Sequence, residues 1–173
     1  EDLGASLVTV AKDVKLQIEF NPLHVKGYRL IGYENRLLAY EDFDNDEVDA
    51  GDMGAGHEVI ALYEIIPAGS DEPIVSAEFE LPENLKYDGA NHEDELLTVS
   101  IRYKEPDSDR SKLLSATLSA TLPETSSGAF RFAACVAEFG LLLRDSVYKG
   151  TSSYNNVIAR ATVLADDDYK EEF

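Results

Sequence analysis

The sequence predicts an α+β domain in which antiparallel, sandwich-like sheets of about six strands are followed by two or three packed helices. Alternating apolar and polar runs occupy residues 13–122, helical periodicity occupies residues 128–173, and the two patterns do not alternate along the chain. With 173 residues, of which 44% are hydrophobic, the chain is long enough to bury a substantial core.

Six segments have the alternation or the short apolar runs of β-strands. These segments are Val14–Phe20, Val25–Tyr33, Val59–Ile66, Ile74–Leu81, Leu97–Tyr103 and Leu114–Leu122. Val59–Ile66 is apolar on both faces apart from Glu64, which predicts a central strand covered on both sides. Ile74–Leu81 is acidic and bounded by prolines, which favours an edge position.

The helical part begins near Ser127 and Gly128, and Phe130–Arg144 is apolar nearly all round, so we expect it to be covered on several sides. Ser153 is a candidate N-cap for a second helix, and Tyr169–Phe173 begins another helical turn. We expect the strands and the first helix to bury one set of side chains together. This set is Leu16, Ile18, Phe20, Leu30, Val59, Ala61, Tyr63, Val99, Ile101, Leu118, Phe132, Val136 and Phe139.

Charge is distributed unevenly along the chain. The net charge is −19, and residues 37–85 hold fourteen acidic residues and no Lys or Arg. Such a field repels nucleic acid and anionic lipid head groups, so we expect no nucleic-acid partner. The apolar runs are shorter than the roughly 20 residues that cross a bilayer, so this domain is not expected to insert into a membrane. Cys135 is the single cysteine and fits a small buried apolar residue.

The most distinctive local feature is a loop rich in carboxylates. Asp42, Asp44 and Asp46 have the spacing that opens an EF-hand calcium loop, but Glu47 and Met53 replace the expected Gly and bidentate Glu. A low-affinity Ca²⁺ site, a structural acidic loop and a partner-binding loop all fit this composition. The candidate metal ligands are Asp42, Asp44, Asp46, Asp49 and Asp52.

Catalytic signatures are missing from the sequence. His24, His57 and His92 lack metal-ligand spacing and adjoin no nucleophile, and there is no nucleophile elbow. Asp107, Asp109 and Ser111 approach an adhesion-type metal motif, but the third position is acidic and a strand follows. We therefore expect a protein that is not an enzyme and has no catalytic or cofactor-binding residues.

Several strings together resemble one bacterial family across nearly the whole chain. They are Ala11–Pro22, Tyr28–Arg36, Asp49–His57 with Ala61–Glu64, Ile101–Pro106, Phe130–Ala134 and Tyr148–Gly150. The chain resembles the C-terminal domain of unknown function that follows a von Willebrand factor type A domain in envelope proteins, often lipoproteins. Residues 1–173 would then be a single domain excised from a larger protein, and residues 1–12 would be the end of the type A domain or a linker.

The resemblance implies a non-catalytic accessory domain, active in protein–protein interaction or adhesion. Its location would be the periplasm or the cell surface, with a lipoprotein anchor in the parent. The implied partners are the type A domain and the N-terminal region of the same parent, together with a protein ligand that the sequence does not identify. The excised domain would expose an unpaired strand edge or an apolar patch and could form a homodimer. The alternative is a structural domain stabilised by Ca²⁺ in the loop of residues 41–56.

Overall fold

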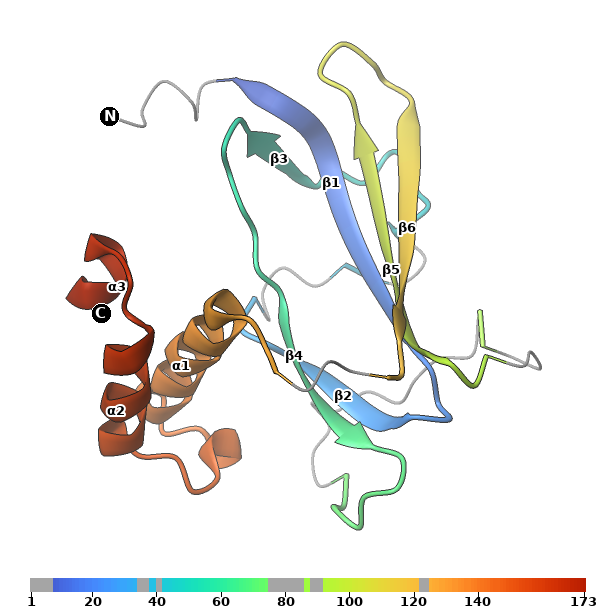
Figure 1. The fold of residues 1–173 in the computed structure, drawn as a ribbon. Helices are drawn as coiled ribbons and strands as arrows, with labels where there is room; N and C mark the ends of the chain where they lie inside the picture. The colour runs from blue at the N-terminus through green and yellow to red at the C-terminus, as the bar shows by residue number, and fades with distance from the viewer. Residues whose placement is uncertain (1–7, 34–37, 40–41, 75–85, 88–91, 122–124) are drawn as a thin grey trace. The chain divides into compact units, whose positions relative to one another are not determined.

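The computed structural model describes residues 8–33, 38–39, 42–74, 86–87, 92–121 and 125–173 (Figure 1). Six strands in two sheets come first and the helices come last, which confirms the predicted α+β class with antiparallel strands. The chain divides into two compact units. One unit contains residues 1–59 and 63–122, and the other contains residues 60–62 and 123–173.

The larger sheet has four strands in the order β3-β1-β5-β6. They are β1 (Thr9–Phe20), β3 (Gly51–Gly54), β5 (Glu95–Lys104) and β6 (Ser111–Ser119). All neighbouring pairs in this sheet are antiparallel. The alternation of β1, β5 and β6 predicted these strands, whereas β3 contains two glycines within the acidic segment and carried no strand signal.

The second sheet pairs β2 (Val25–Ile31) with β4 (Leu62–Pro67). Phe20, Val25 and Leu96 form a buried cluster, and Tyr28 and Tyr63 pack against it. The ring of Phe20 lies 4.5 Å from that of Tyr28 and 5.7 Å from that of Tyr63, between centroids. This aromatic core joins residues of both sheets in the strand-rich unit.

Val59–Ile66 was predicted to be a doubly covered central strand, but β4 begins at Leu62, Val59 and Ile60 are exposed, and β4 pairs with β2 alone among the described strands. The prediction was wrong because an apolar run does not reveal how many neighbours its backbone will find. The predicted strand Ile74–Leu81 lies almost entirely outside the described residues.

The helical unit consists of α1 (Gly128–Leu143), a 3₁₀ turn η4 (Val147–Lys149), α2 (Tyr154–Leu164) and α3 (Asp168–Glu172). Ser127 caps α1 and Ser153 caps α2, and each side chain accepts a hydrogen bond from the backbone N–H three residues ahead. The helix start near Ser127 and the cap at Ser153 were predicted. Cys135 is buried with Val157 and Ala161 between α1 and α2, and Phe132 and Phe139 pack against this cluster.

The expectation that all thirteen side chains are buried was wrong. Phe20 is the one member of the predicted set that is buried, while Leu16, Val59, Leu118 and Val136 are exposed. The first helix, expected to be covered on several sides, buries Cys135 and Leu141 but exposes Phe130 and Leu143. Alternation identifies which side chains share a face, but it does not identify what covers that face.

Candidate functional site

The register of β1, β5 and β6 divides their side chains between two faces of unequal chemistry. Residues directly opposite one another in an antiparallel pair lie on the same face. Successive rows contain Leu16, Ile101 and Leu114, then Ile18, Val99 and Ala116, then Phe20, Leu97 and Leu118. We call the nine side chains of these three rows the apolar face. The opposite rows hold Lys15 with Arg102, Gln17 with Ser100 and Glu19 with Thr98, which we call the polar face.

The acidic loop, residues 42–52, is held onto the polar face by Lys15. This lysine is only 3% exposed, and its ammonium group donates hydrogen bonds to the backbone oxygens of Asp42, at 2.9 Å, and Asn45. A buried ammonium group requires acceptors on all sides that face away from water. The loop supplies them from its backbone, so its carboxylates remain available for other partners.

Arg102 of β5 binds two of those carboxylates. Its Nη1 lies 2.9 Å from Asp44 Oδ1, and its Nη2 lies 3.1 Å from Asp46 Oδ1. The Ser111 hydroxyl also donates to Asp46 Oδ1. The Ser111 hydrogen bond, followed by the bond and the charge of Arg102, lowers the pKa of Asp46 below its ordinary value.

A third cation, Lys104, pairs with Asp13 in the irregular part of β1. Lys104 Nζ lies 2.7 Å from Asp13 Oδ2, while Asp13 Oδ1 accepts a hydrogen bond from the Ala50 backbone N–H. The pKa of Asp13 is lowered mainly by the hydrogen bond from Lys104 and next by the bond from the Ala50 N–H. The hydrogen bond between Lys104 and Asp13 also raises the pKa of Lys104. Asp13 has a positive φ of 49°, and the β1–β5 register shifts between Lys12 and Lys15. This bulge lets Asp13 reach both the loop and β5.

The predicted calcium ligands therefore occupy different environments. Asp44 and Asp46 face Arg102, and Asp52 accepts a hydrogen bond from the Asp13 backbone N–H. Asp42 contributes its backbone oxygen, and the side chain of Asp49 is exposed. No group of three or more His, Cys, Asp or Glu side chains in the described part of the chain has a metal-binding arrangement. Calcium binding by this loop stays a prediction, and the observed bonds favour the structural interpretation of the loop.

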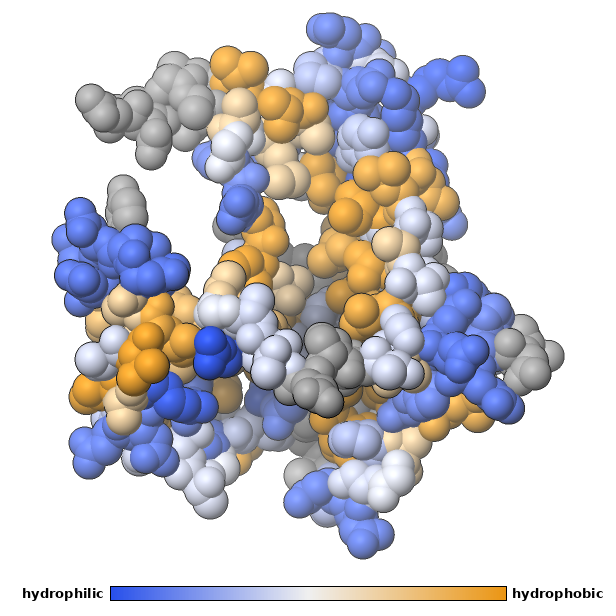
Figure 2. Space-filling model, in the orientation of Figure 1, coloured by the Kyte–Doolittle hydropathy of each residue, from blue (hydrophilic) through white to orange (hydrophobic). Residues whose placement is uncertain are grey.

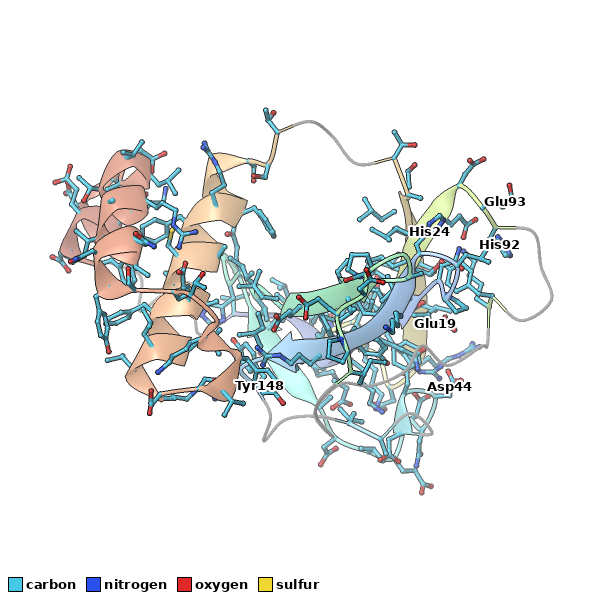
Figure 3. The ribbon with its side chains drawn as sticks, turned by 90° about the horizontal axis from the view of Figure 1, so that it is seen from below. Glu19, His24, Asp44, His92, Glu93 and Tyr148 are labelled. Carbon is cyan, nitrogen blue, oxygen red and sulfur yellow. The ribbon has the colours of Figure 1, made fainter. Side chains whose placement is uncertain are left out.

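A second polar cluster closes the other end of the sheet. The buried Asn21 side chain donates to the backbone oxygens of His92, at 2.9 Å, and Glu95, at 2.7 Å, and accepts from the Leu23 N–H. His24 Nε2 lies 2.6 Å from the Glu93 backbone oxygen. Figure 3 shows His24, His92 and Glu93 close together at this end. Sequence reasoning missed the cluster because about 70 residues separate its two halves, and no local pattern connects them.

Lys86 and Tyr87 extend this cluster over the polar face. Lys86 Nζ lies 2.6 Å from Glu95 Oε2 and 2.8 Å from Thr98 Oγ1, and the Tyr87 hydroxyl lies 2.7 Å from the same Thr98 oxygen. Burial raises the pKa of Tyr87, and the hydrogen bond from Lys86 lowers the pKa of Glu95. These contacts join loop to strand and bury Thr98, which indicates a structural role.

Several large side chains of the apolar face are in contact with solvent. Leu16, Leu114 and Leu118 are exposed, Ile18, Leu97, Val99 and Ile101 are partly buried, and Phe20 is buried. Hydrophobic residues gather over β5 and β6 in the space-filling view (Figure 2). In addition, β6 is an edge of the sheet, since it pairs with β5 alone among the described strands. An apolar face that ends at an unpaired edge is typical of a surface that binds another polypeptide.

The helical unit contains an open groove of about 600 Å³. Phe139, Tyr154, Ile158, Ala161 and Phe173 line its apolar part. Lys170 also lines the groove and pairs with Asp166 and Asp167. The groove is therefore mainly apolar, and its one lysine is neutralised by neighbouring acids.

Comparisons with known proteins identify a family for this chain. Residues 5–173 match the family described as "Uncharacterized protein YfbK, C-terminal". The chain belongs to this family. An Escherichia coli (strain K12) relative, "Uncharacterized protein YfbK", is 41% identical over 175 residues.

The matched stretch covers 99% of the chain but 30% of the E. coli relative. The chain therefore spans less than a third of the length of this YfbK relative. No solved structure matches the chain. Within the described residues of this YfbK C-terminal domain, no helix has the length and apolar character needed to cross a bilayer.

Proposed function

We propose that this chain is a non-catalytic accessory domain of a larger bacterial protein and acts through protein–protein contacts. The observation that carries the proposal is the exposed apolar side of the sheet. Loop contacts bury Lys15 and Thr98 on the polar face, whereas Leu16, Leu114 and Leu118 of the apolar face remain exposed. A surface of this kind is usually covered by another part of a protein.

The resemblance of the sequence supports a more specific proposal for the parent. The domain would follow a von Willebrand factor type A domain in a lipoprotein-anchored envelope protein, and it would stabilise that domain and the N-terminal region. The E. coli relative leaves room for such regions, because the matched stretch is only 30% of its length. Adhesion or assembly at the cell surface would then be a property of the whole parent.

Deletion of this domain from the intact parent tests the proposal. Removing residues 1–173 is expected to lower the thermal midpoint of the remaining type A region, because that region loses a stabilising contact. Adding the chain back as a separate polypeptide should restore the midpoint in part and controls for damage caused by the deletion. A midpoint that does not change on deletion argues against an accessory role.

A further inference from the structure

We infer that β6 is a docking edge for an extended segment of the same parent polypeptide, which adds a further strand beside β6 and continues the apolar face. This inference rests on the proposed function and identifies the surface and the kind of partner. It follows from the backbone of β6, the side chains around it and the charge of the chain.

The backbone of β6 is suited to strand addition. It spans nine residues and carries a single charge, at Lys112. Natural edge strands that must stay unpaired are commonly short, bulged or protected by charged side chains. The β5–β6 ladder is regular from Leu97 to Lys104, so the outer edge of β6, which pairs with no other strand of the described residues, presents evenly spaced backbone groups. An added strand would satisfy these groups, as in β-augmentation.

The side chains specify the chemistry of the partner. Leu114, Ala116 and Leu118 continue the rows that begin at Leu16, Ile18 and Phe20, so the apolar face reaches the edge without interruption. A strand that covers this edge should place apolar residues at alternate positions on the same side. On the opposite side it should place small polar residues beside Ser115 and Thr117.

Two observations favour a segment of the parent over a second copy of this chain. First, the net charge of −19 makes two copies repel one another, which opposes self-association. Second, more than two thirds of the E. coli relative lies outside the matched stretch. A tethered segment binds at a high effective concentration and needs little intrinsic affinity.

Hydrogen exchange of the intact parent and of the chain alone tests the inference. Amides of β6 are expected to exchange about tenfold or more slowly in the parent, since an added strand protects them. Amides of β5, which is paired on both sides in either protein, serve as the internal standard. Equal and rapid exchange of β6 in both proteins overturns the inference.

Leucine variants of the intact parent locate the docking face. Leu114→Lys is expected to return β6 exchange toward the rate of the chain alone, because the ammonium group would lie in the new apolar contact. Leu113→Lys is the matched control: Leu113 is 58% exposed and Leu114 57%, but they lie on opposite faces of β6. Unchanged β5 protection shows that each variant is folded, and Leu118→Lys provides a second test of the same face.

The outcomes separate this inference from the proposed function. If deletion of the domain destabilises the type A region but β6 exchanges rapidly in the parent, the accessory role stands and the docking edge is wrong. Equal effects of Leu113→Lys and Leu114→Lys overturn the face assignment. Protection of β6 in the chain alone that increases with protein concentration identifies a second copy as the occupant and also overturns the inference.

Discussion

At the scale of single residues, the strongest constraint on the acidic loop is Lys15. A lysine is rarely this deeply buried unless its charge is satisfied, and here two backbone carbonyls of the loop accept hydrogen bonds from its ammonium group. The contact joins the middle of β1 to a segment about 30 residues away. Lys15 therefore determines where the loop lies on the sheet.

Lys15→Met is expected to destabilise the chain by about 2 kcal/mol, because two carbonyl groups lose their donor while the apolar stem is retained. Urea denaturation measures the change. Lys26→Met is the control, since Lys26 donates one exposed hydrogen bond to the Glu72 backbone oxygen. Its cost should stay within about 0.5 kcal/mol. Equal losses for the two variants would contradict the role assigned to Lys15.

The Asp13–Lys104 pair predicts a pH dependence of stability. The pKa of Asp13 is lowered from 3.8, so its contribution is present above that value and is lost as pH falls through the lower, folded pKa. The pKa of Lys104 is raised from 10.5, so its contribution is present below 10.5 and is lost as pH rises through the folded pKa. The pair should therefore stabilise the fold between these limits.

Asp13→Asn is expected to flatten the acid limb of the stability profile, as measured by urea denaturation from pH 6 down to about pH 2, because the pair has then lost its titrating carboxyl group. Lys104→Met should have the same effect, and the double variant should add little to either single variant. Strict additivity of the two changes would show that the groups act independently.

At the scale of elements, Asn21 connects the end of β1 to the start of β5. Its side chain makes three hydrogen bonds to backbone groups while it is almost fully buried. The Asn21 backbone N–H also donates to the Leu96 oxygen, which continues the β1–β5 contact into the turn. Asn21 thus sets the geometry of the turn that leads into β2.

Asn21→Ala is expected to destabilise the chain by about 2 kcal/mol or more, because buried backbone groups would lose their partners. Thermal unfolding followed by circular dichroism measures the effect. Asn45→Ala is the comparison, since its side chain accepts one hydrogen bond, from the Glu47 N–H, in an exposed turn. A loss no larger than that of Asn45→Ala would exclude the proposed role of Asn21.

At the scale of the whole molecule, the net charge of −19 opposes folding through self-repulsion. We expect added NaCl to raise the thermal midpoint, because salt screens this repulsion. The calcium hypothesis predicts a larger rise with CaCl₂ at the same ionic strength, and the extra rise should vanish in an Asp44→Ala, Asp46→Ala double variant. Equal rises in the two salts would contradict a calcium site.

The sequence predicted the positions of most strands, a helix start near Ser127 and the cap at Ser153 because these depend on local features. Alternation in β1, β5 and β6 places their side chains on two faces, and Ser127 and Ser153 accept hydrogen bonds three residues ahead. The acidic loop was also recognised as distinctive from composition alone. These properties depend only on residues that are close together in the sequence.

Tertiary structure decided which partners those residues meet. Arg102 reaches Asp44 across 58 residues, and His24 reaches Glu93 across 69. Such pairings follow from strand order and register, which alternation does not encode. For the same reason the sequence predicted the apolar face correctly but not its exposure. Alternation reports the direction of each side chain, whereas burial depends on what packs against the completed sheet.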